Sequence, residues 1–232
     1  MESLKDIHAF ALSKIKDKFP LKAVPLRHPF PERPARTLGL IKFDADVFTS
    51  EKFSRVVLMR VNLPFYFRAT STFLRPRVEL GLPPFDAETV IMGKRRIFMV
   101  DIQATGKSAG CDESALFERL IKIRNRYPAL IAKKMKIKGE IQNVFSKAAC
   151  QVKTTENQDT QALSIFDEYF DVFLEMVEKA APLSGDGLDL ARQAFEEYSY
   201  RVLNHDPGVK TFKVFFGKEG GMERVHDIFF AS

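Results

Sequence analysis

The chain has 232 residues, 45% of them hydrophobic, so it is long enough to bury a substantial core. Its 36 basic and 30 acidic residues leave a net charge of +6, a modest excess whose distribution matters more than its size. Two distant cysteines and four scattered histidines exclude a disulfide framework and a structural zinc site, and no apolar run approaches a membrane span. No linker separates two cores, so we expect a single domain over residues 1–232.

The first half of the chain predicts one helix followed by short strands. Residues 2–18 place their apolar side chains on one helical face, and the proline-rich passage 20–34 predicts no regular structure. The following runs are rich in Val, Ile, Phe and Thr and are separated by turn signals. These runs predict strands over residues 37–43, 55–62, 65–74, 88–92 and 95–103. Consecutive strands with no helix between them predict an antiparallel sheet built from meanders.

Beyond Gly110 the apolar spacing becomes helical. Repeated apolar faces predict helices around residues 115–123, 165–177 and 188–202. Together with the helix at the N-terminus, they supply cover for both faces of the sheet. We therefore expect an α+β fold, a three-layer α/β/α sandwich around a central antiparallel sheet.

The tail combines an acid, a proline and a glycine stop. Asp206 suits the N-cap of a helix that begins at Pro207, because proline fits the first helical turn. The glycine-rich run 217–221 predicts the end of that helix, and a second apolar helix follows it. This run lacks the order of a phosphate-binding loop, and no dinucleotide fingerprint follows a strand, so we expect no bound redox cofactor.

The strongest charge run lies between Arg119 and Lys138, where eight basic residues stand without an acid among them. Such a patch attracts an acidic partner, which can be a protein, a phosphate or a nucleic acid. A solvated basic face with no partner explains the same pattern equally well. The sequence leaves both interpretations open.

Short anchors along most of the chain resemble the ferredoxin-dependent bilin reductases, and the chain looks like a divergent member that is also distantly similar to red-chlorophyll-catabolite reductases. No anchor is specific alone, but their order and spacing match the family. The anchors are residues 19–22, 51–56, 74–76, 81–85 and 98–103, the helix around 166–179 and the tail.

The resemblance implies that the chain reduces a linear tetrapyrrole, biliverdin or a related bilin, to a phytobilin-type product. It places Glu88 and Asp206 as carboxylic acids that donate protons, and Ser71, Thr72 and His205 as contacts to the substrate. Each of these residues also has a plain structural interpretation. Asp206 can serve only as a helix cap, Glu88 as a solvated strand residue, His205 as a surface histidine, and the two hydroxyl residues as ordinary strand formers.

Two departures from the family pattern limit what the resemblance implies. Family members carry an aspartate where this chain has Glu88, and the red-chlorophyll-catabolite reductases are similar in having a glutamate there. The phycocyanobilin-forming branch also uses a glutamate and a histidine on two earlier strands. Met59 and Ser71 stand at the matching positions, so the resemblance does not extend to phycocyanobilin-type chemistry.

The resemblance further implies that reduced ferredoxin supplies the electrons and that no cofactor or metal is bound. Ferredoxin is a small acidic protein, so Arg124, Lys133, Lys134 and Lys136 are the expected docking residues. We expect a monomer without membrane or nucleic-acid partners, in the cytoplasm, or in the plastid stroma if a transit peptide has been removed. The alternatives are a non-catalytic bilin-binding protein of the same fold and, ranked last, a basic module that binds nucleic acid.

Overall fold

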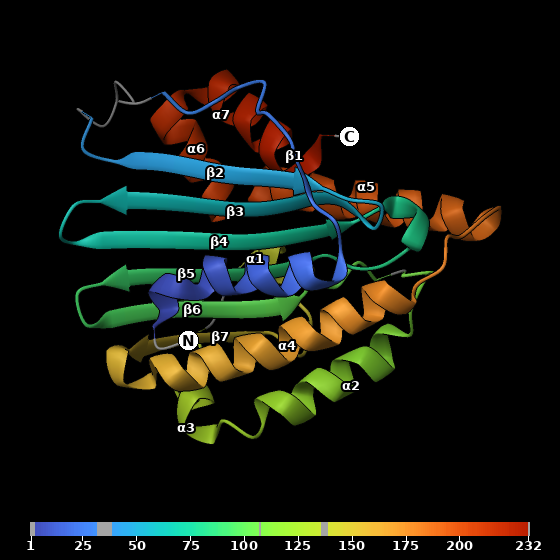
Figure 1. Ribbon diagram of the computed structural model, residues 1–232, viewed down its shortest axis with the longest axis horizontal. Coiled ribbons are helices and arrows are strands. Elements are labelled where there is room, and N and C mark those ends of the chain that lie inside the picture. Colours follow the sequence, from blue (N-terminus) through green and yellow to red (C-terminus); the bar gives the residue numbers. More distant parts are fainter. Residues whose placement is uncertain (1–2, 32–38, 107, 136–138, 232) are drawn as a thin grey trace.

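The computed structural model describes residues 3–31, 39–106, 108–135 and 139–231. Its centre is a seven-stranded antiparallel sheet whose strands lie side by side in the order of the chain. Helices cover both faces, so the expected α+β, three-layer α/β/α arrangement is confirmed (Figure 1). The strands are β1 (Lys22–Ala23), β2 (Lys42–Thr49), β3 (Phe53–Leu63), β4 (Phe67–Pro76), β5 (Phe85–Met92), β6 (Arg95–Ile102) and β7 (Cys150–Thr155).

The predicted strands agree with β3 to β6, but the prediction for residues 37–43 is wrong. Residues 37 and 38 lie outside the described residues, and β2 begins only at Lys42. Its acids Asp44 and Asp46 obscured the strand pattern in the sequence, because aspartate is disfavoured in strands. In the sheet both carboxylates pair with Arg60 of β3, which offsets that preference. The sequence also failed to predict β7 and the two-residue strand β1 within the proline-rich passage.

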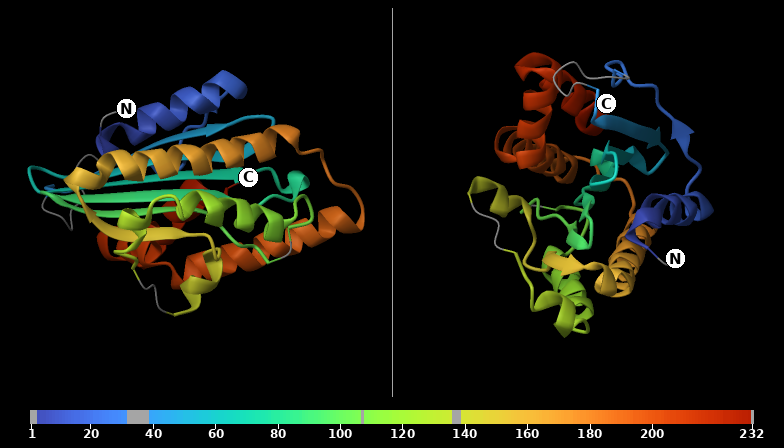
Figure 2. Two further views of the ribbon diagram at one scale, coloured as in Figure 1. Left: turned by 90° about the horizontal axis from the view of Figure 1, so that it is seen from below. Right: turned by 90° about the vertical axis from the view of Figure 1, so that its left-hand side faces the viewer.

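The helices divide into two layers. The long helix α4 lies with α1 and α2 over one face of the sheet, and α5, α6 and α7 lie on the other (Figure 2). The α-helices are α1 (Ile7–Lys18), α2 (Glu113–Arg124), α3 (Pro128–Ile131), α4 (Asp159–Lys179), α5 (Asp186–His205), α6 (Pro207–Phe216) and α7 (Lys218–Val225). A π-helical turn, His226–Phe230, follows α7, and short 3-10 turns lie at Leu4–Asp6, Val78–Leu80, Glu140–Val144 and Glu156–Gln158.

The face under α1 and α4 is closed by packed phenylalanine rings. Phe85 of β5 lies with its ring centroid 5.0 Å from Phe170 and 5.3 Å from Phe173, both on α4. Phe53 of β3 meets Phe173 at 6.1 Å, and all four side chains are fully buried. Truncating one such ring to alanine costs about 3–5 kcal/mol, so this layer supplies much of the stability of the fold.

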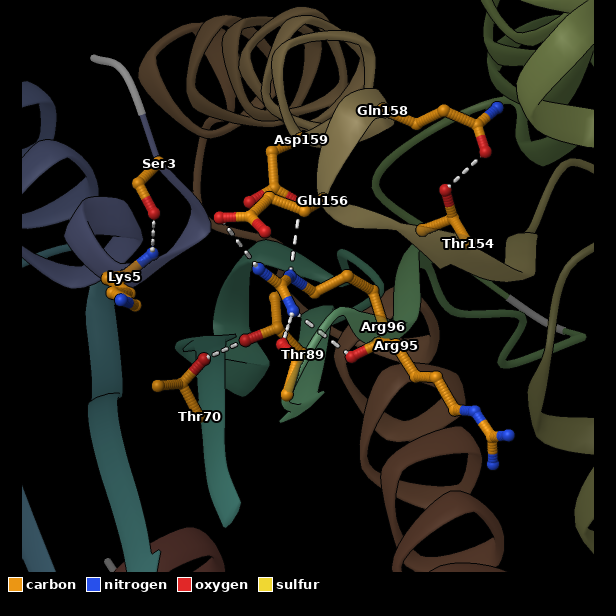
Figure 3. Close-up of polar contacts among 11 residues, drawn as sticks. Ser3, Lys5, Thr70, Thr89, Arg95, Arg96, Thr154, Glu156, Gln158 and Asp159 are labelled. Carbon is orange, nitrogen blue, oxygen red and sulfur yellow. Dashed lines mark hydrogen bonds and ion pairs between the residues drawn. The ribbon is translucent and has the colours of Figure 1, made fainter. Parts of the chain in front are cut away.

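A buried arginine fixes the start of α4 to the sheet (Figure 3). Arg96 of β6 is only 3% exposed, and its Nε donates to Oδ1 of Asp159, the first residue of α4, at 3.2 Å. Glu156 adds a carboxylate oxygen 3.9 Å from Nη2 of Arg96. Because a buried charge is stable only when it is paired, these two acids make the buried position of Arg96 tolerable.

On the opposite face, a glycine allows α6 and α7 to cross closely. Gly217 ends α6 with a positive φ of 83°, which confirms the predicted glycine stop. A Cβ atom on Gly221 would lie 2.7 Å from backbone atoms of Phe212 and Lys213, a distance that only glycine avoids. The two short helices therefore pack as one unit over β2 to β5.

Candidate active site

The face of the sheet under α5, α6 and α7 is hollowed by two adjoining pockets. The acidic pocket is small, about 70 Å³, and lies in the middle of the face, while the apolar pocket, about 490 Å³, lies toward the β3–β4 hairpin. The lining residues common to both are Met59, Ser71, Glu88, Gly208 and Phe212. Because they share these residues, the two pockets form one continuous site between the sheet and α6.

Strand alternation points Glu88 and Ser71 into this site. Ser71 of β4 stands directly opposite Glu88 of β5, and Met59 of β3 stands opposite Ser71. Side chains on neighbouring strands at paired positions share a face, so all three reach the same pocket. Glu88 lines both pockets, but its side chain is exposed, so the interpretation of Glu88 as a solvated strand residue stays open.

Asp206 faces Glu88 from the helical layer. It lies between α5 and α6, and its Oδ1 accepts hydrogen bonds from the backbone N–H groups of Gly208 at 2.6 Å and Val209 at 3.3 Å. The predicted N-cap is therefore confirmed, and the same carboxyl also lines the acidic pocket. Helix capping fixes the position of the acid, because the capping geometry sets its side-chain orientation.

Both carboxyls hold their protons more strongly than usual. Burial, and then the negative charge of Asp206, raise the pKa of Glu88 to about 7. Burial also raises the pKa of Asp206, although its hydrogen bonds to Gly208 and Val209 oppose the change. A carboxyl with a pKa near 7 is populated in both states at neutral pH, which suits it to general-acid chemistry.

A third carboxyl, Asp86, lies two residues before Glu88 on the same face of β5, and the sequence analysis missed it. Burial raises the pKa of Asp86 well above its ordinary value, and the charges of Glu88, Asp206 and Asp101 raise it further. Its Oδ2 accepts a hydrogen bond from Gln103 Nε2 at 3.1 Å. The two-residue period of a strand was the signal that could have found it.

The hydrogen-bond network of Asp86 reaches across to the helical layer. The hydroxyl of Tyr198 on α5 donates to Oε1 of the same Gln103, so sheet and helix are joined through one buried amide. Burial, followed by the charges of the nearby carboxyls, raises the pKa of Tyr198 far above its usual value, so this hydroxyl stays protonated. The hydrogen bonds that link Tyr198, Gln103 and Asp86 thus form a fixed polar wall of the acidic pocket.

Of the three predicted substrate contacts, only Ser71 lines the site. Thr72 follows Ser71 on β4, so strand alternation turns it to the face under α1, where its Oγ1 is buried and has no hydrogen-bond partner among the described residues. His205 is the last residue of α5, beside Asp206, and it lines neither pocket. Neither Thr72 nor His205 is among the residues that line the two pockets, and their contact with a substrate stays a prediction.

Three of the expected docking residues, Arg124, Lys133 and Lys134, lie around α2, α3 and β7, at the edge of the sheet. Lys133 and Lys134 are exposed, whereas the Arg124 guanidinium donates to the backbone oxygens of Lys147 at 3.0 Å and Ala149 at 3.2 Å. Lys136 lies outside the described residues.

The charge run around these residues is less positive in space than in sequence. Arg119 pairs with Glu175 of α4 at 2.7 Å, and Arg126 pairs with Glu168 of the same helix. The acids come from a helix more than 40 residues further along the chain. Only part of the run remains free to attract a partner.

A model of the ferredoxin-dependent bilin reductase family matches residues 8–231. This chain belongs to that family. It is 23% identical to the phycoerythrobilin:ferredoxin oxidoreductase of Gloeobacter violaceus over 211 residues, which cover 88% of this chain and 86% of that protein. The protein of the same name from Parasynechococcus marenigrum is 23% identical over 163 residues, covering 68% of this chain and 62% of the relative.

The fold matches that of a solved bilin enzyme. Phytochromobilin synthase from tomato, whose crystal structure contains biliverdin, aligns with a TM-score of 0.81 at 17% identity, covering 95% of this chain and 80% of that one. The family resemblance drawn from the sequence anchors is confirmed, as is the enzyme class, since the relatives in this bilin reductase family are oxidoreductases. No helix in the described parts of the chain is long and apolar enough to cross a membrane.

Proposed function

We propose that the protein reduces a linear tetrapyrrole, biliverdin or a related bilin, to a phytobilin-type product with electrons from reduced ferredoxin. Glu88 and Asp206 donate the protons. One observation carries this proposal: two carboxyls with raised pKa line one pocket from opposite layers, beside a large apolar pocket, in a bilin reductase fold.

The apolar pocket suits the shape of the substrate. A linear tetrapyrrole is planar and conjugated, and about 490 Å³ lies within the usual range for a site that takes a small organic ligand. Phe43, Phe212 and Phe215 line the pocket and offer flat apolar surfaces to such a ligand. The shared residues Met59 and Ser71 then bring the ligand into contact with the acidic pocket.

The two acids supply what the electron donor lacks. Reduction of one double bond takes two electrons and two protons, and ferredoxin delivers electrons singly, without protons. A neutral carboxyl donates its proton to a carbon of the singly reduced ligand, becomes a carboxylate, and is protonated again from water. Because the pKa of Glu88 is about 7, a large fraction of the enzyme holds this proton at neutral pH.

Asp86 keeps the sheet side of the pocket neutral. Burial and the neighbouring carboxylates raise its pKa, which disfavours an additional negative charge beside Glu88 when that carboxyl loses its proton. Gln103 and Tyr198 hold Asp86 in place through their hydrogen bonds. We assign this trio a positioning role, and the hydroxyl of Ser71 a contact to a polar group of the ligand.

Ferredoxin docks, in this proposal, at Arg124, Lys133, Lys134 and Lys136, of which Lys133 and Lys134 are exposed. Docking between oppositely charged surfaces speeds encounter and permits rapid release, as an electron donor requires. The enzyme acts as a monomer, in the compartment that holds ferredoxin.

The deciding experiment is an anaerobic absorbance time course with biliverdin, before and after reduced ferredoxin is added. A spectral shift on mixing, followed by loss of the long-wavelength band and a new product band, is the expected result. A shift without turnover would favour the alternative, a bilin-binding protein that does not catalyse reduction. Absence of any shift would refute both.

A further inference from the structure

A third cavity, the arginine pocket, lies at the other end of the same sheet face. It has a volume of about 490 Å³, and four arginines line it together with two glutamates, Glu79 and Glu196. The arginines are Arg55, Arg75, Arg77 and Arg192. Only Phe230 is common to this cavity and the acidic pocket, and the apolar pocket shares no residue with it. The arginine pocket is therefore separate from the proposed bilin site.

Two of these arginines face each other across neighbouring strands. Arg55, near the start of β3, is paired in register with Arg75, near the end of β4, and the side chains are on the same face. The two residues are 5% and 6% exposed. Like charges at directly opposed positions repel, and burial makes each charge costly unless an acceptor compensates it.

Each of the three guanidinium nitrogens of Arg75 donates a hydrogen bond to an acceptor. Its Nη1 and Nη2 donate to the backbone oxygens of Phe230 at 3.0 Å and Ala231 at 2.8 Å, and its Nε donates to Ser54 Oγ at 2.6 Å. The guanidinium also lies 4.8 Å from the ring centroid of Phe195. Arg75 thus anchors the segment after α7 to the sheet, which is a structural role.

Arg55 lacks the acceptors that Arg75 has. Its Nη1 donates to the Ser54 backbone oxygen at 2.9 Å, but its Nε is buried and without a partner. Within the described residues, Nη2 has no hydrogen bond and no carboxylate lies within ion-pair distance of this guanidinium. Asp227 attracts it from further away and already accepts a hydrogen bond from the His28 backbone N–H.

Arg96 has the carboxylate partners that Arg55 lacks within the described residues. Both are buried strand arginines on the same sheet, yet Arg96 meets Asp159 and Glu156 (Figure 3). At Arg55, Nε and Nη2 have no acceptor among the described residues although protein atoms cover Nε, and the spacing of these two donors matches the two oxygens of a carboxylate or phosphate.

We propose that the arginine pocket binds a small organic anion, whose carboxylate or phosphate oxygens accept from Nε and Nη2 of Arg55 and whose apolar body lies against Phe195 and Phe230. The volume of the pocket fits a ligand of this size. The bound anion offsets the repulsion between Arg55 and Arg75. The proposal does not depend on bilin reduction, because Phe230 is the one lining residue that the arginine pocket shares with the two pockets of the bilin site in the described parts of the chain.

Calorimetric titration of the full chain tests it with three probes: phenyl phosphate, benzoate and neutral benzyl alcohol. We expect one of the two anions to bind at one site and benzyl alcohol to bind at least tenfold more weakly; the preferred anion identifies the anionic group. In Arg55→Met the affinity for that anion falls at least tenfold. Arg95→Met is the matched control: it removes the same charge from an exposed site on β6 and leaves the affinity unchanged.

The titration is repeated with the bilin site saturated by biliverdin, and the expected dissociation constant for the anion is unchanged. Displacement by biliverdin would overturn the proposal, because the anion would then occupy the bilin site. So would absence of anion binding by the wild-type chain, or equal affinity in Arg55→Met. If Arg55→Met fails to fold, the wild-type NMR signals of arginine Nε–Hε groups decide: the anion shifts a protected one, and no shift refutes the assignment.

Discussion

The two faces of the central sheet are built from the same strands but differ in almost every physical respect. Under α1 and α4, fully buried rings such as Phe85 and Phe170 pack against one another. Under α5, α6 and α7, the described residues enclose three cavities, and carboxyls and guanidiniums are buried between them. On β5 the change occurs within four residues: Phe85 and Ala87 belong to the closed face, Asp86 and Glu88 to the open one.

The difference between the two faces shows how the fold tolerates ionisable side chains that reduce its stability. Buried acids with raised pKa and opposed arginines reduce the stability of the folded state. A densely packed apolar layer on the reverse of the same strands offsets that loss without entering the site. Mutations on the closed face should therefore change stability, and mutations on the open face should change chemistry or binding.

The largest expected effect is on turnover. Glu88→Gln and Asp206→Asn should each lower the rate of bilin reduction by about 10²–10⁴-fold, the usual contribution of a positioned general acid. Binding of biliverdin, followed by its spectral shift, should be largely retained, since both changes keep size and polarity. Asparagine also caps helices, so α6 should persist. Glu178→Gln, on the outer surface of α4, is the control; full turnover in both pocket variants would remove their proposed roles.

On the closed face, Phe85→Ala should lower the free energy of unfolding by about 3–5 kcal/mol, because it leaves a cavity among Phe166, Phe170 and Phe173. Phe215→Ala, in the apolar pocket, should cost less stability and weaken biliverdin binding instead. Denaturant titration and bilin titration of both variants measure the two quantities. Equal losses of stability in the two variants would mean that the closed face does not contribute more to stability than the open face.

The pH dependence of stability tests the raised pKa of Glu88 on the open face. The folded pKa of Glu88, about 7, lies above its ordinary value of 4.5, so the folded protein binds more protons than the unfolded chain between these values. Glu88 therefore makes stability fall as pH rises from about 4.5 to 7. Glu88→Gln should show a shallower fall when unfolding is measured across this range, and the wild-type turnover should decline above about pH 7. Identical slopes would contradict the raised pKa.

The smallest expected effect concerns the wall of the acidic pocket. Tyr198→Phe removes the hydroxyl that donates to Gln103 and should cost about 1 kcal/mol, the usual value for one hydrogen bond. Phe195→Leu on the same helix should cost a similar amount but leave the product spectrum unchanged. A change in product regiochemistry in Tyr198→Phe alone would support the positioning role; identical products in both variants would argue that the wall is only structural.

Local patterns predicted most of this architecture. Strand and helix periods located β3 to β6 and the long helices, and the acid-proline pair located the start of α6 together with Asp206. The features that the sequence did not predict depend on contacts between distant segments. The polar strand β7 is recognisable only beside β6, and the opposition of Arg55 and Arg75 follows from a register that no single strand reveals.

Contacts between distant segments also change the setting of the predicted site residues at two points. Thr72 was grouped with Ser71 by sequence proximity, although adjacent strand residues face opposite layers. The basic run lost part of its charge to Glu168 and Glu175, acids that α4 brings beside it. Sequence thus named candidate residues, while the sheet and helix packing showed which of them line the same pocket.

The chain-order arrangement of the strands bears on how the molecule is made. Each strand after β1 pairs with the strand that precedes it in the chain, and only β7 is separated from its partner by α-helices in the described residues, so most of the sheet can grow strand by strand as the chain leaves the ribosome, with little loop-closure entropy. The cover of the open face, α5 to α7, emerges last. Until then Val57, Phe73 and their apolar neighbours are exposed on a nascent intermediate, which would be the species most prone to aggregate and most in need of a chaperone.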